Sequence, residues 1–252
     1  IRPAGQAPNR RVRSAQTLGL KVGTEHHFAA VVEAASATVS ADATVVSNFA
    51  WQHMRAASIF VGHALQVEQR YGEALYGTAL EELRSYVSGA VMSAAASHEA
   101  LKNEFYLAPS TGLRGRIANF EAEFWAKGGI ERKPILVKYQ HALELLGLPR
   151  IPEDDESLIQ ADALVGLRNS LVHFKPLWDS ERPNAQDLRQ RLNGAFNLSR
   201  WATPDDDFVA KQCMSADCAR WAVASALAFM WAFNERAHLD NDKMAGFRSI
   251  EA

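Results

Sequence analysis

Hydrophobic positions recur every three or four residues along most of this chain, a spacing that is typical of amphipathic helices. The clearest stripe runs from about Gly77 to Tyr106, and its small residues would let another helix approach closely. A further helix, capped by Asp154 or Asp155, should end before Lys175, because the residue before a proline avoids helical geometry. The same spacing predicts helices over residues 49–69, 113–125, 134–146, 185–192 and 215–238. The sequence therefore predicts an all-α protein.

The beginning of the chain does not follow this pattern. Residues 1–24 are basic, with prolines and glycines that argue against a long helix. An irregular surface segment is the simpler interpretation, and a basic arm that contacts RNA or a partner is the alternative. Residues 37–46 are rich in β-branched side chains and suggest a short strand or hairpin. We expect an N-terminal extension with one helix over residues 1–75, followed by a helical bundle over residues 76–252.

One charged residue interrupts the apolar face of the helix that precedes Lys175. Arg168 has only apolar neighbours one or two turns away, namely Ala161, Leu164, Val165, Leu171 and Val172. A buried charge without a partner is costly, so Arg168 requires a carboxylate, an anionic ligand or a wet cleft. Asn169 lies four residues before His173, so these two side chains share a helix face.

The stretch Arg168-Asn169, three residues, His173-Phe174-Lys175-Pro176 resembles the R-x4-6-H motif of HEPN domains, all-helical proteins that include many metal-independent RNases. The segment from Ser97 to Glu104 is similar to the L-E-A-x-x-N-E segment that precedes the motif helix, except that His98 stands where a leucine is usual. The resemblance covers about residues 80–240 and implies a HEPN-like helical bundle. It also implies that Arg168, Asn169 and His173 are catalytic and that Glu99 and Asn103 support them.

The resemblance further implies cleavage of RNA by its own 2′-hydroxyl, without metal or cofactor, at a composite site in a homodimer. His173 would act in acid–base chemistry, Arg168 would stabilise the charge on phosphorus, and Asn169 would orient His173 or the phosphate. Five residues on an ideal helix separate two side chains by about 140°. A second copy, or a distorted helix end, would bring both side chains to one phosphate.

Two other interpretations stay open. In the first, the domain is a non-catalytic HEPN-like module for nucleotide binding or protein–protein assembly, and Arg168 forms a structural ion pair with Glu99. Glu99 could equally lie on a solvated helix face. In the second, the protein is a toxin-like RNase that an inhibitory or antitoxin partner silences.

The charge and the residue composition limit the kinds of binding site that this chain can form. The 252 residues carry a formal net charge of −2, so RNA contacts would need a local patch rather than a general basic field. Cys213 and Cys218 lack the paired spacing of zinc or redox sites, and buried free thiols are expected. His98 lies on an apolar stripe and is expected to be a hydrogen-bonded core residue. The acidic residues from Asp205 to Asp207 are typical of a solvated helix start rather than a cation site.

The sequence also gives an expectation for where the protein is located in the cell. No apolar run reaches the roughly 18 residues expected of a membrane span. The chain shows no secretory signal pattern. A cytoplasmic protein without membrane partners is therefore the default expectation.

Overall fold

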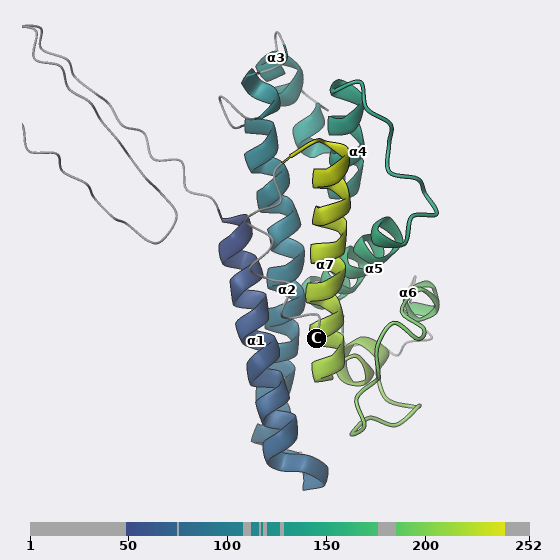
Figure 1. The fold of residues 1–252 in the computed structure, drawn as a ribbon. Helices are drawn as coiled ribbons and strands as arrows, with labels where there is room; N and C mark the ends of the chain where they lie inside the picture. The colour runs from purple at the N-terminus through teal and green to yellow at the C-terminus, as the bar shows by residue number, and fades with distance from the viewer. Residues whose placement is uncertain are drawn as a thin grey trace, which may run out of the picture. The chain divides into compact units, whose positions relative to one another are not determined.

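The computed structural model describes residues 49–74, 76–107, 112–115, 117, 120–126, 129–175 and 185–239. Within these ranges all regular elements are helical, which confirms the all-α class (Figure 1). The α-helices are α1 (Ala50–Tyr71), α2 (Thr78–Leu107), α3 (Phe120–Trp125), α4 (Ile135–Leu145), α5 (Glu156–Val172), α6 (Ala185–Arg191) and α7 (Ala216–Arg236). None of these helices is both long and apolar enough to cross a membrane.

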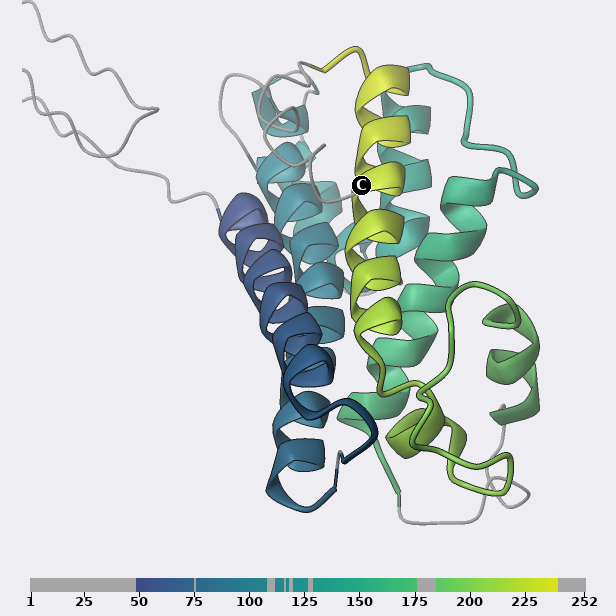
Figure 2. The same cartoon turned by 60° about the horizontal axis from the view of Figure 1, so that its bottom comes forward.

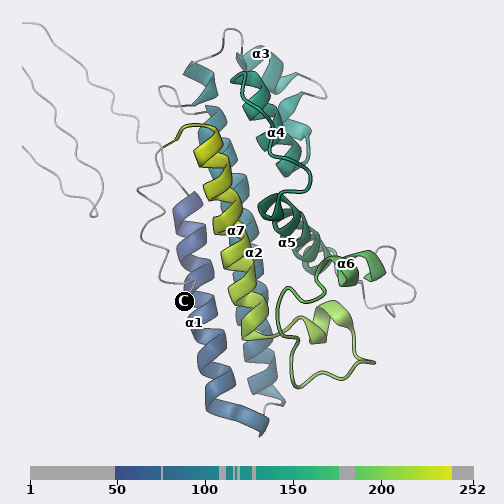
Figure 3. The same ribbon diagram turned by 45° about the vertical axis from the view of Figure 1, so that its right-hand side comes forward.

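Three long helices, α1, α2 and α7, lie side by side (Figures 1 and 3). The buried stripe of α1 packs in a common core with α2 and α7, because its apolar residues recur at threes and fours: Ala50, Met54, Ala57, Val61, Ala64 and Val67. Small residues permit a close approach of α1 and α2. A Cβ placed on Gly89 would lie only 3.1 Å from the ring of Phe60. The small-residue face that the sequence predicts for α2 is therefore confirmed.

The motif helix α5 packs against the other side of the bundle. Helix α7 lies between α1 and α5, and α6 lies beyond α5 (Figure 2). A second core cluster, rich in aromatic rings, joins one end of α2 to α3, α4 and α7; its rings belong to Phe105, Tyr106, Phe120, Phe124, Tyr139, Phe229 and Phe233. His98 is fully buried beside this cluster, and its Nε2–H donates to the Ala226 carbonyl at 3.1 Å. The expectation of a core histidine is confirmed.

Capping residues fix several helix ends where the sequence places them. The Asp155 carboxylate accepts from the Ser157 amide at 3.0 Å and starts α5. The Ser215 hydroxyl accepts from the Cys218 amide at 3.1 Å and starts α7. Gly147 follows α4 with a φ of +70°, a conformation that favours glycine. Asn184, the expected cap of α6, lies outside the described residues, as do residues 1–24 and 37–46.

Two expectations about the elements are corrected. The single helix expected over residues 113–125 is wrong: a 3₁₀ turn at Leu113–Gly115 is followed by α3, which starts only at Phe120. Gly115 lowers helix stability there by about 1 kcal/mol relative to alanine. The bundle also begins before residue 76, because α1 belongs to the compact unit Ser47–Ala252. An apolar stripe must be buried against something, and α2 provides that surface.

Candidate functional site

Helix α5 presents the motif at its carboxyl end. The helix ends at Val172, and His173 is the first residue beyond it, with its amide still donating to the Asn169 carbonyl at 2.9 Å. Lys175 lies outside the helix, as the following proline predicts. Arg168 and Asn169 therefore lie in the last turn and a half of α5, and His173 caps its end.

The buried face of α5 stops before the motif. Ala161, Leu164 and Leu167 are fully buried, whereas Val172 is 46% exposed. Arg168 lies at this transition and is half-buried, and Asn169 and His173 are exposed. The apolar face expected around Arg168 is thus buried in its first half only, and the guanidinium is reached by solvent.

Arg168 has no ion-pair partner among the residues that the structure describes. The expected pair with Glu99 is not formed. Glu99 instead contacts the ammonium of Lys102, one turn further along α2, at 2.9 Å. Lys102 is only 2% exposed, so it needs a counter-charge more than the half-buried Arg168 does.

A second buried lysine adjoins this pair. Lys138 on α4 is 6% exposed, and burial, followed by the nearby Lys102 side chain, lowers its pKa. Glu99 therefore compensates buried positive charge between α2 and α4. The sequence gives a weaker signal for these lysines than for Arg168, because His98 and Glu99 precede Lys102 by one turn and His141 follows Lys138 by one turn.

The other expected supporting residue also makes no hydrogen bond to the motif. Asn103 is exposed on α2, and no hydrogen bond in the described part of the chain joins it to Arg168 or His173. Its neighbour Glu104 has a structural role, accepting from the amides of Phe49 and Ala50 at 2.8 and 3.0 Å. Arg168, Asn169 and His173 thus share the end of α5, and among the described residues neither Glu99 nor Asn103 forms a hydrogen bond or ion pair with them.

A groove borders the end of α5. It has a volume of about 520 Å³ and lies between α2 and the motif turn. Its lining comprises Glu81, Arg84, Ser85, Ser88 and Met92 from α2, Leu171, Val172 and Phe174 beside His173, and Ala210 and Met214. The sequence could not reveal this groove, because its two walls are about 80 residues apart in the chain.

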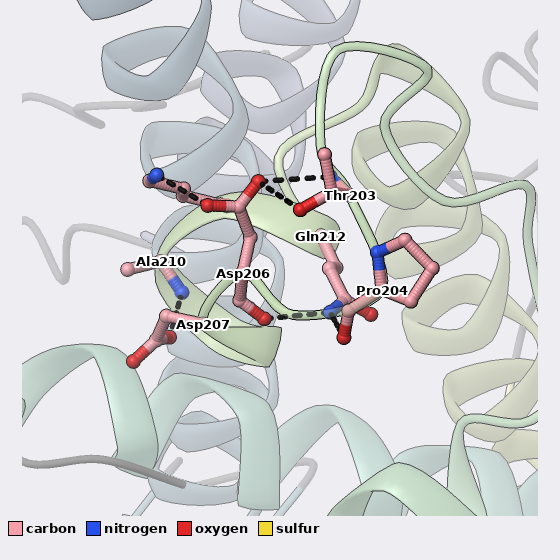
Figure 4. A network of polar contacts seen from close by, with 7 residues as sticks. Thr203, Pro204, Asp206, Asp207, Ala210 and Gln212 are labelled. Carbon is pink, nitrogen blue, oxygen red and sulfur yellow. Dashed lines mark hydrogen bonds and ion pairs between the residues drawn. The ribbon is translucent and has the colours of Figure 1, made fainter.

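The acidic turn is structural, as expected (Figure 4). The Asp206 carboxylate pairs with Lys211 and accepts from the Thr203 amide at 2.8 Å, and these contacts lower its pKa to about 2. Asp207 accepts from the Ala210 amide at 2.7 Å and caps the turn Phe208–Gln212. Among the described residues there is no cluster of three or more His, Cys, Asp or Glu side chains suited to a metal ion. Cys213 and Cys218 are both buried and free, as expected.

Comparison of the chain with protein-family models, with curated proteins and with solved structures found no match. The chemistry of the site must therefore be argued from its own residues. An accessible guanidinium can hold a phosphate, an exposed imidazole can transfer a proton, and a carboxamide can orient either group.

Proposed function

We propose that this protein is a metal-independent endoribonuclease of the HEPN type that cleaves RNA at a composite site in a homodimer. The observation that supports the proposal most directly is that Arg168 is half-buried and accessible and lacks a carboxylate partner among the described residues. Its parallel N–H donors can therefore bind a phosphate in a bidentate manner.

The reaction would be a transesterification at phosphorus. The ribose 2′-oxygen attacks the adjacent phosphorus while its proton passes to a base, and the bond from phosphorus to the 5′-oxygen breaks as that oxygen gains a proton. The products are a 2′,3′-cyclic phosphate and a 5′-hydroxyl. His173 serves one of the two proton transfers, and Arg168 stabilises the extra negative charge on the phosphoryl oxygens. Asn169, one turn before His173, orients the imidazole or the phosphate.

A second copy of the chain completes the site. Arg168 and His173 are five residues apart, and on an ideal helix two side chains at this spacing point about 140° apart. Two motif helices that meet about a two-fold axis would place Arg168 of one copy beside His173 of the other. The exposure of Asn169 and His173 at the end of α5 leaves this surface open to such a contact.

The test is cleavage of a mixed labelled RNA in the presence of EDTA. Wild-type protein should leave 2′,3′-cyclic phosphate ends, and His173→Ala should lose roughly 100-fold or more of the activity. His63→Ala is the matched control, because His63 is an exposed histidine on α1 that stacks on Tyr86 away from the motif. It should cleave like the wild type.

Circular dichroism would establish that all three proteins are folded. Equal cleavage by wild type and His173→Ala would contradict the proposed role of His173. Failure of every folded, dimeric protein to cut would favour the alternative, a helical module for nucleotide binding or assembly.

A further inference from the structure

The groove beside the motif carries an unusual amount of exposed apolar surface. Met92, Val172 and Phe174 are 38%, 46% and 40% exposed, and all three line it. The almost fully buried Met214 contributes to the same lining. Exposed apolar side chains gathered on a concave surface are typical of a binding site. His173 stands between Val172 and Phe174 in the chain, so the groove borders the motif turn, although the His173 side chain is not part of its lining.

The serine and glutamate oxygens of the groove can accept hydrogen bonds from a ligand, and Arg84 supplies the N–H donors of this wall. The Ser85 hydroxyl donates to the Glu81 carbonyl at 2.8 Å, and the Ser88 hydroxyl donates to the Arg84 carbonyl at 2.6 Å. A serine hydroxyl has one proton, so only the lone pairs of these two oxygens remain for a ligand. The Glu81 carboxylate in the same lining is also an acceptor. Arg84 adds one positive charge to this wall.

We propose that this groove seats the nucleobase next to the scissile phosphate and selects cytosine and adenine, which carry an amino group at C4 and C6, over uracil, which carries an oxygen at C4. This inference rests on the proposed RNase function. The amino group of cytosine or adenine donates to the serine and glutamate oxygens, whereas the corresponding edge of uracil presents an oxygen that these acceptors repel. Met92 and Phe174 provide apolar contact for the faces of the base, and Arg84 attracts the phosphate.

A second copy of the chain is the competing occupant. An apolar cover would bury Glu81 and the serine oxygens without a donor, and Arg84 without an acceptor. A base satisfies these acceptors and the apolar walls together, so the chemistry of the groove favours a nucleotide.

The experiment compares binding of cytidine 3′-monophosphate and uridine 3′-monophosphate to the full chain, followed by NMR titration. The cytidine nucleotide should bind roughly tenfold more tightly. Ser88→Ala should reduce this preference, and Phe174→Ala should weaken both nucleotides. Ser58→Ala is the matched control, because its hydroxyl makes the same bond to a carbonyl four residues earlier, at 2.9 Å, on α1 outside the groove. It should change neither affinity.

Equal affinities for the two nucleotides, or binding that Phe174→Ala leaves unchanged, would overturn the proposal. Absence of binding, together with loss of dimer by Phe174→Ala in sedimentation, would assign the groove to a second copy instead. The two proposals can fail separately. Selective nucleotide binding without RNA cleavage would reject the RNase alone, whereas RNA cleavage with equal nucleotide affinities would reject only the assignment of the groove.

Discussion

At the scale of single residues, buried ionisable groups are the most informative feature of this molecule. His98 is fully buried, and among the described residues no hydrogen-bond partner faces its Nδ1 atom. Burial lowers the pKa of His98 to about 4, although the Ala226 carbonyl opposes the shift. The imidazole is therefore neutral in the folded protein at neutral pH.

This burial makes stability depend on pH. Between pH 6.5 and 4 the unfolded chain binds a proton at His98 that the folded chain does not, so the stabilisation is full above pH 6.5 and falls as the pH falls. Wild-type protein should lose about 2 kcal/mol of unfolding free energy between pH 7 and pH 5. Urea unfolding of wild type and His98→Gln measures this effect. An equal pH dependence in the two proteins would contradict it.

The candidate site was predicted in part from its residues. The apolar neighbours of Arg168 predicted a buried face around it, but the structure leaves Arg168 half-buried and Val172 exposed, without a carboxylate partner for Arg168 among the described residues. The ion pair predicted between Arg168 and Glu99 was wrong, because Lys102, on the same helix as Glu99, pairs with it instead. A sequence pattern shows which positions share a face but not which of two cations lies deeper.

At the scale of elements, the regular spacing of apolar residues was sufficient to predict the long helices. Their boundaries follow capping residues such as Asp155 and Ser215, whose chemistry is local and therefore readable from the sequence. The single helix predicted from Leu113 to Trp125 was wrong, because Gly115 disfavours a continuous helix there. The short helix α3 packs on the end of the preceding helix α2, with the ring centroids of Phe120 and Phe124 at 5.7 and 5.4 Å from that of Tyr106.

Two glycines within helices, Gly62 on α1 and Gly89 on α2, allow a prediction about the contact between α1 and α2. A Cβ on Gly89 would lie 3.1 Å from two atoms of the Phe60 ring, whereas a Cβ on Gly62 meets nothing within 4 Å. Gly62→Ala should stabilise the protein by about 0.5–1 kcal/mol through helix propensity. Gly89→Ala should be about 1 kcal/mol less stable than Gly62→Ala, because the ring must shift. Chemical denaturation compares them, and equal gains would show that the α1–α2 contact is loose.

At the scale of the whole molecule, folding brings together helices that are far apart in the sequence. Helix α1 joins the compact unit, and α2 meets the end of α5 to form the groove beside His173. Neither result could be predicted from local spacing, because each depends on which helix faces which. The same is true of the proposed dimer, whose site requires two copies of α5.

The most direct measurement of the central claim mixes two inactive variants. Arg168→Ala and His173→Ala would be combined, allowed to exchange subunits, and assayed for RNA cleavage in EDTA. In a composite site, a mixed dimer holds one site with both changes and one with neither. Random exchange should therefore restore roughly a quarter of wild-type activity. A mixture that stays inactive, although both variants are folded and exchange subunits, would show that Arg168 and His173 do not act across two chains.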